Sequence, residues 1–239
     1  MSSTVIVFAI ALVAWTTEGA IGFGGTVIAA CIGAQFVPLD TLLPAFVVIN
    51  LALSLSIVAR THSSIAWRLL GVDIAIPVAL GAAGGIALAR SAPAALVPAF
   101  GGFVVALAVL QLVRPADRPL ALVPRLALLV VGGIAHGMFG TGGPMIVYVA
   151  RRKLPDKRAF RATLAVLWIT LNIALVTSFA TQGAYTTEVR NLGLVIAPAL
   201  IPGLIAGEQL HKRLDAARFE RIVWILLLVA GSALVIRSL

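Results

Sequence analysis

The sequence predicts an all-α polytopic membrane protein built from two inverted repeats, each with a V-shaped broken re-entrant helix and three transmembrane helices. Three observations lead to this prediction: long apolar runs, a glycine block that occurs twice, and an uneven distribution of basic residues. Of the 239 residues, 61% are hydrophobic and only 11% are charged. A soluble domain is about half apolar and about a quarter charged, so the composition indicates an integral membrane protein.

Eight apolar runs follow one another along the chain. They cover about residues 4–37, 42–59, 69–89, 95–113, 125–150, 162–180, 191–210 and 222–236. As a single helix, the first run of about 34 residues would extend about 51 Å, whereas the hydrocarbon core of a bilayer is about 30 Å thick. This run is therefore either one discontinuous crossing helix or a hairpin that enters and leaves on the same side.

A glycine block interrupts the first run and recurs 118 positions later in the fifth. The residues from Glu18 to Gly25 align without gaps on those from His136 to Gly143, and four of the eight columns are glycine in both copies. A helix break at membrane depth is tolerated only where the freed backbone is buried or lines a cavity. Matching breaks in two halves of a chain are the best sequence pointer to the binding site of a transporter.

Weaker matches extend the duplication beyond the glycine block. The matched pairs lie 121 or 122 residues apart and are Pro77 with Pro198, Gly81 with Gly203, Gly85 with Gly207, and Asn50 with Asn172. A proline-rich connector divides the chain near its middle. We therefore expect a first membrane repeat over residues 1–113, a linker over 114–124 and a second membrane repeat over 125–239.

The basic residues distinguish the two geometries of the broken runs. If all eight runs cross the membrane, the connectors place 11 Lys and Arg residues on one side and 7 on the other. If the two broken runs are hairpins, 15 share one side and only Arg90, Arg190 and Arg237 face the other. Because basic residues collect in cytoplasmic loops, the second split favours six crossings with both termini non-cytoplasmic. Eight crossing helices, two of them discontinuous, are the alternative.

This topology has two consequences. Each repeat contains three crossings, an odd number, so the second repeat is inverted relative to the first, as in many secondary transporters. The net charge of +9 then reflects orientation in a cytoplasmic (inner) membrane, and we expect contact with the lipid bilayer rather than with nucleic acid.

Each predicted break places the N-terminus of a second half-helix near mid-membrane, at Thr26 and at Pro144. Helix N-termini carry unpaired N–H groups and partial positive charge, and they bind anions. Two of them converging would form an anion cradle. The candidate substrate-binding residues are Gly22, Gly24, Gly25, Thr26, Asn50, Gly140, Thr141, Gly142, Gly143 and Asn172. Alternatively, the glycines only allow neighbouring helices to pack closely, and the asparagines only form hydrogen bonds between helices.

Glu18 and His136 occupy matching positions just before the two glycine blocks. Ionisable residues inside a membrane are costly and usually functional, and histidine changes charge near neutral pH. Both are therefore candidates for proton coupling, and a structural hydrogen bond is the alternative for each. The three histidines and the single cysteine have no metal-ligand spacing. We expect no cofactor, no metal and no enzymatic activity.

The motifs GAIGFGG at 19–25 and GMFGTGGP at 137–144 resemble those of the TauE/SafE family of sulfite exporters, and the resemblance covers nearly the whole chain. Thr26 departs from the pattern, since it stands where the second copy has Pro144. The resemblance implies export of sulfite or an organosulfonate such as sulfoacetate. It places the family motif on Gly22, Gly24, Gly25, Gly140, Gly142 and Gly143.

Together these features predict a secondary transporter that exports a small anion by alternating access. Proton coupling is a hypothesis that depends on Glu18 and His136. An anion channel is the nearest alternative, and a membrane-embedded enzyme is a more distant one, because the sequence shows no cluster of His, Asp, Glu and Ser at one membrane depth.

Overall fold

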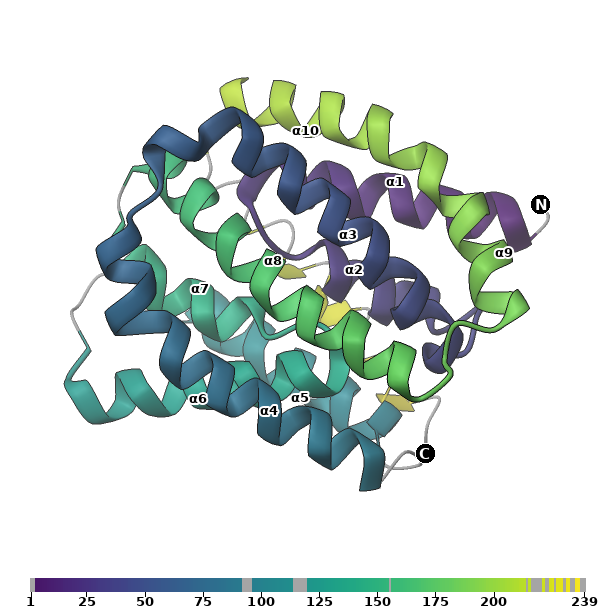
Figure 1. Cartoon of the computed structure of the whole chain (residues 1–239), viewed down its shortest axis with the longest axis horizontal. Coiled ribbons are helices and arrows are strands. Elements are labelled where there is room, and N and C mark those ends of the chain that lie inside the picture. The colour runs from purple at the N-terminus through teal and green to yellow at the C-terminus, as the bar shows by residue number, and fades with distance from the viewer. Residues whose placement is uncertain are drawn as a thin grey trace.

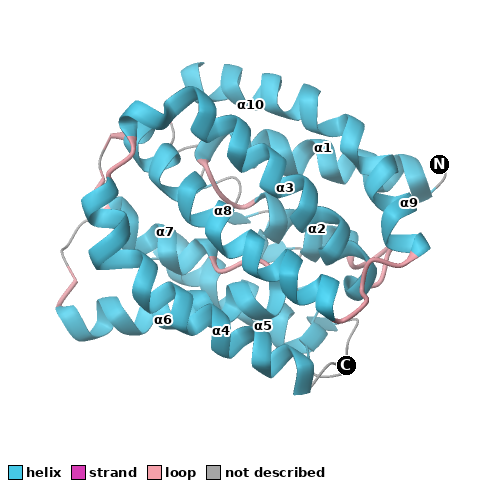
Figure 2. Cartoon of the chain, in the orientation of Figure 1, coloured by secondary structure: helices cyan, strands magenta, loops and turns pink. Residues whose placement is uncertain are grey.

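The computed structural model describes residues 3–91, 96–113, 120–154, 156–213, 215 and short stretches between 221 and 236. Every regular element within these residues is helical (Figure 2). The α-helices are α1 (Ser3–Ile21), α2 (Gly25–Gly33), α3 (Leu39–Thr61), α4 (Ile76–Ser91), α5 (Leu96–Val113), α6 (Leu122–Phe139), α7 (Gly143–Arg151), α8 (Lys157–Thr181), α9 (Thr187–Ile196) and α10 (Leu200–Arg213). A π-helical stretch, Leu69–Ala75, leads into α4, and a short 3₁₀ turn, Ala197–Ala199, joins α9 to α10.

Six helical segments of the described chain are long and apolar enough to cross a membrane. They are Thr4–Ile21, Leu39–Ser64, Leu69–Arg90, Leu122–Phe139, Lys157–Thr181 and Thr187–Arg213. The predicted class, an all-helical polytopic membrane protein, is confirmed.

These six segments differ from the six crossings that the sequence predicts. Two of them, α1 and α6, are the first limbs of the broken runs. The predicted crossing at 95–113 corresponds to α5, in which the apolar helix Gly101–Leu110 is shorter, and the one at 222–236 is described only in fragments. Most of the predicted linker, residues 114–119, lies outside the described residues. The number of crossings, the inversion and the repeat boundaries therefore stay predictions.

Two helix pairs pack closely through small residues, and each pair joins the two halves of the chain. In Figure 1, α10 runs along α1 at the top of the view, and α4 lies beside α6 at the bottom. A Cβ atom added at Gly203 of α10 would lie 3.0 Å from the Cβ of Trp15, and one added at Gly81 of α4 would lie 3.0 Å from the Cα of Gly133. The two interfaces correspond, because their residues occupy matching positions of the two repeats: Gly81 matches Gly203, and Trp15 matches Gly133.

Substitution of a glycine in the interface between α4 and α6 tests how tight this packing is. A Cβ atom at Gly85 would overlap the backbone of Ile134, whereas one at Gly84 in the same helix would meet nothing within 4 Å. We expect Gly85→Ala to destabilise the protein by about 1–3 kcal/mol, the usual cost of overpacking. Gly84→Ala should leave stability unchanged or raise it slightly, because alanine favours helix. Melting temperatures in detergent measure both, and equal values would contradict this packing.

Helices α3 and α8 cross the middle of the molecule (Figure 1) and pack against each other. They carry the matched residues Asn50 and Asn172, both of which are buried. The two broken segments lie beside this pair, and α2 contacts α3. This arrangement brings polar residues from four separate parts of the sequence into the interior.

Candidate functional site

Glycine allows the turns that break both long runs. Helix α1 ends at Ile21, and Gly22 and Gly24 then have φ values of 85° and 92°. Helix α6 ends at Phe139, and Gly140 follows with φ 65°. Only glycine adopts this left-handed region without a steric penalty, which explains why a glycine block marks each break.

After each turn the second half-helix folds back along the first. A Cβ atom added at Gly25, the first residue of α2, would lie 2.7 Å from the carbonyl oxygen of Ala14 and 3.0 Å from the Cβ of Glu18. One added at Gly132 of α6 would lie 3.2 Å from the Cβ of Met145 in α7. Both broken segments are thus V-shaped, with limbs close enough that a larger side chain at these positions would separate them.

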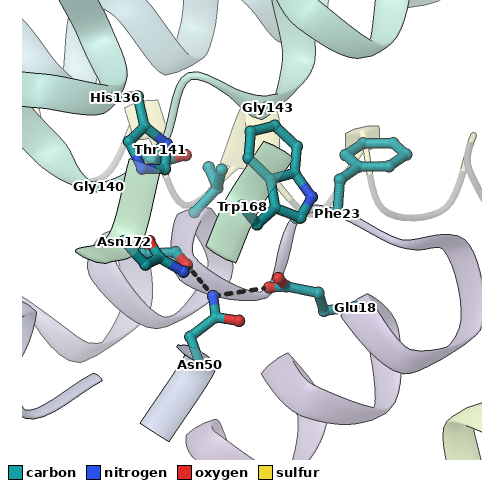
Figure 3. A pocket seen from close by; sticks show the side chains of 12 residues that line it. Glu18, Phe23, Asn50, His136, Gly140, Thr141, Gly143, Trp168 and Asn172 are labelled. Atoms are coloured by element: carbon teal, nitrogen blue, oxygen red, sulfur yellow. Dashed lines mark hydrogen bonds between the residues drawn. The ribbon is translucent and has the colours of Figure 1, made fainter. Parts of the chain in front are cut away.

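The two turns meet at a buried cavity of about 20 Å³ (Figure 3). It is lined by Glu18, Phe23, Gly24, Thr26, Val27, Asn50, His136, Gly140, Thr141, Gly143, Trp168 and Asn172. Nine of these twelve are candidate residues from the sequence, including both proton-coupling candidates. The remaining candidates, Gly22, Gly25 and Gly142, are not among the lining residues and pack against the limbs and α8 instead.

The first repeat contributes a connected set of polar side chains to the cavity. The Asn50 side-chain amide donates hydrogen bonds to Thr26 Oγ1 at 2.8 Å and to Glu18 Oε2 at 3.2 Å (Figure 3). All three side chains are buried. One asparagine on α3 therefore links the end of α1 to the start of α2 across the turn.

The second repeat leaves hydrogen-bonding capacity unused at the same cavity. Among the described residues, Thr141 Oγ1 and Asn172 Nδ2 are buried without a hydrogen-bond partner. The His136 ring also lacks a hydrogen bond of normal geometry, although Asn172 is close enough to interact with it. An unpaired buried polar group costs about 1–3 kcal/mol. Such groups around a cavity indicate a place where a ligand or water binds.

Trp168 is a residue of the site that the sequence analysis missed. Its indole Nε1 donates a hydrogen bond to the Gly22 carbonyl oxygen at 2.8 Å. Its ring stacks on His136, with centroids 5.7 Å apart and planes 7° from parallel. Trp168 thus contacts both breaks. Its spacing in the sequence could have indicated this role, since Trp168 stands four residues before Asn172 and therefore lies on the same face of the helix.

Arg161 also has a role that its sequence context did not reveal. In the sequence it is one of the 15 basic residues expected on one side of the membrane, but in the structure its side chain is buried. One guanidinium nitrogen donates to the Gly19 carbonyl oxygen at 2.7 Å, and another pairs with Glu208 at 2.7 Å. Nearby, His211 Nδ1 lies 2.7 Å from the Ala20 carbonyl oxygen. These groups satisfy carbonyls that the end of α1 leaves without helical partners.

A polytopic helical protein in which two glycine-broken helices meet at a buried polar cavity has the architecture of a membrane transporter. Comparison with known families gives the same class: the model of the sulfite exporter TauE/SafE family matches residues 7–234. The chain belongs to this family, as the paired glycine motifs predict. This is a family of membrane transporters and not of enzymes.

A curated relative agrees with this assignment. The probable inner membrane transporter protein TsaS of Comamonas testosteroni is 26% identical over 103 residues, which are 43% of this chain and 43% of that protein. The match therefore spans less than half of the relative's length. No solved structure matches the chain.

Proposed function

We propose that this protein is a secondary transporter that exports a small anion, sulfite or an organosulfonate such as sulfoacetate, across the inner membrane by alternating access. The observation that carries this proposal is the buried cavity at which two helix breaks and unpaired donor groups meet. The family description, a sulfite exporter, supports sulfur oxyanions as the class of substrate.

The chemistry of the cavity suits an anion held by neutral donors. Thr26 and Gly143, in the first turns of α2 and α7, both line it, so backbone N–H groups and the positive ends of two helix dipoles are close. The Thr141 hydroxyl and the Asn172 amide add donors without partners. The described lining residues include neither Lys nor Arg, and weak neutral donors allow the anion to be released as well as bound.

The size of the cavity favours a carrier over a channel. About 20 Å³ holds little more than one water molecule, so sulfoacetate enters only if the walls separate. Alternating access supplies such a movement, because two halves that rock around a fixed site open it to each side in turn.

The inverted arrangement of the repeats is part of this proposal. Two corresponding interfaces support it. In one, the broken helix α1 of the first repeat packs against α10 of the second; in the other, the broken helix α6 of the second repeat packs against α4 of the first. With the basic connectors in the cytoplasm, both termini lie outside it.

A binding screen against the purified protein tests the substrate assignment. We expect sulfite and sulfoacetate to raise the melting temperature in a concentration-dependent way, and simple carboxylates to raise it less. Asn172→Ala should weaken binding of sulfoacetate by about 10- to 150-fold, because a hydrogen bond to a charged group contributes about 1.5–3 kcal/mol and each 1.4 kcal/mol is tenfold.

Asn191→Ala is the matched control for this screen, since Asn191 is exposed on α9 and should leave affinity unchanged. Failure of every sulfur oxyanion to bind would contradict the proposed substrate class. Unchanged affinity in Asn172→Ala would remove this residue from the site.

A further inference from the structure

A partly buried cluster of charged and polar residues lies where α8 and α10 meet the end of α1. This cluster, hereafter the Arg161 cluster, consists of Arg161, Glu208 and His211. Arg161 pairs with Glu208 at 2.7 Å and donates to the Gly19 carbonyl at 2.7 Å, and His211 contacts the Ala20 carbonyl at 2.7 Å. The cluster therefore ties α8 and α10 to the end of α1, directly before the first break.

A cavity of about 430 Å³ opens elsewhere in the molecule. Its lining includes Leu39 of α3, Ile86 and Ala89 of α4, and Gly137 and Met138 of α6. It also reaches Phe139, the last residue before the second break. We call this cavity the Leu39 vestibule.

Three residues of the vestibule lining match the three residues of the cluster in the other repeat. Leu39 stands eleven residues before Asn50, and Arg161 stands eleven before Asn172. Ile86 and Ala89 follow Gly85 by one and four residues, as Glu208 and His211 follow Gly207.

The main-chain partners of the cluster correspond as well. Gly137 and Met138 line the vestibule, and they match Gly19 and Ala20 in the glycine alignment. One repeat leaves an open space whose lining is mostly apolar but includes Asp40, Ser178 and Gln182. The other repeat fills the corresponding place with an ion pair and hydrogen bonds.

We propose that the Leu39 vestibule is the route by which the anion leaves the central cavity, and that the Arg161 cluster is the closed gate at the opposite end of the same route. This rests on the proposed function for the inverted repeats and for the cytoplasmic position of the cluster. The structure then represents a state closed toward the cytoplasm. Opening toward the cytoplasm requires the contacts of Arg161 with Glu208 and Gly19 to break.

The gate is linked to the central cavity through α8. The Arg161 side chain packs against Gly22, where an added Cβ would lie 3.1 Å from the Arg161 Cγ. Trp168, on the same face of α8, donates its hydrogen bond to the carbonyl of the same glycine. A movement that releases Arg161 from α1 therefore reaches the first break directly.

Thiol labelling in membrane vesicles tests the gate without any substrate. In a Cys31→Ala background, which removes the free and buried native cysteine, Ala165→Cys reports on the cytoplasmic side and Leu43→Cys reports on the vestibule. Ala165 is buried one turn beyond Arg161, and the matching Leu43 lines the vestibule. We expect a membrane-impermeant maleimide to label Leu43→Cys from the non-cytoplasmic face and to leave Ala165→Cys protected in inside-out vesicles.

Removing the gate should expose the protected position. Glu208→Ala is expected to raise the labelling rate of Ala165→Cys in inside-out vesicles at least about tenfold, because the buried Arg161 side chain loses its charged partner and the closed form is weakened relative to the open one. Glu208→Gln, which keeps the side-chain volume, should raise it less. A single symmetric peak in size-exclusion chromatography shows that each variant is folded, and labelling of Leu43→Cys from the non-cytoplasmic face should fall as the gate opens, because alternating access closes one side when the other opens.

Asp73→Ala is the matched control. Asp73 pairs with Lys153, and its side chain is 32% exposed, compared with 31% for Glu208. It should not change labelling of Ala165→Cys. Equal labelling of Ala165→Cys with and without Glu208 would overturn the gate. Because no anion is present, failure of the gate is distinguishable from failure of the substrate assignment.

Discussion

Replacing both Gly24 and Gly142 by leucine is expected to abolish anion transport. Gly24 has φ 92°, a conformation that costs about 1–3 kcal/mol for a residue with a side chain. At Gly142, any Cβ would overlap the carbonyl oxygen of Gly132 in the facing limb. Each leucine would push apart the limbs that shape the cavity. Uptake of labelled sulfoacetate into proteoliposomes should therefore fall to the level of protein-free vesicles.

Two other glycines provide matched controls for this loss. Gly183 also has a positive φ, 67°, and Gly193 lies within α9, but an added Cβ meets nothing within 4 Å at either position. Gly183→Leu and Gly193→Leu should transport at nearly the wild-type rate. If the double variant at Gly24 and Gly142 is folded and still transports the anion, the glycine breaks do not form the substrate site.

Glu18→Gln is expected to separate anion movement from the pH gradient. Glu18 is buried at the cavity and accepts a hydrogen bond from Asn50. Glutamine keeps the size and an acceptor oxygen but does not exchange a proton. If Glu18 carries the coupled proton, a pH gradient should drive accumulation of the anion by the wild type. The variant should still exchange labelled for unlabelled anion, but it should not respond to the gradient.

The corresponding control is Glu188→Gln, because Glu188 is exposed in the first turn of α9 and should leave the response to pH unchanged. His136→Gln, measured in the same way, shows whether the matching residue of the second repeat shares the role. A wild-type protein that is indifferent to the gradient would rule out proton coupling altogether.

Most of the site could be predicted from the sequence because its determinants are local. The glycine block of each run allows the backbone conformation that a helix break needs, and Gly22, Gly24 and Gly140 adopt the positive φ values that favour glycine. Duplication then relates residues that are distant along the chain, such as Asn50 and Asn172. The cavity accordingly contains both asparagines, both ionisable residues and both threonines of the prediction.

Trp168 and Arg161 could not be predicted in the same way, because their roles depend on contacts between distant segments. Trp168 reads as one more apolar residue of a spanning helix until its indole meets Gly22, 146 residues earlier. Arg161 reads as an orientation charge until it meets Gly19 and Glu208. Neither position has a matching residue of the same type in the first repeat, where Phe46 and Leu39 stand, so the duplication does not reveal them.

Counterflow in proteoliposomes tests most directly whether the two breaks form the central site of a carrier. Vesicles loaded with unlabelled sulfoacetate are diluted into a trace of labelled sulfoacetate, and the label inside is followed with time. We expect a transient accumulation above equilibrium that is absent in the Gly24→Leu, Gly142→Leu variant. Entry of label that only approaches equilibrium, at a rate independent of the internal anion, would indicate a channel and contradict alternating access.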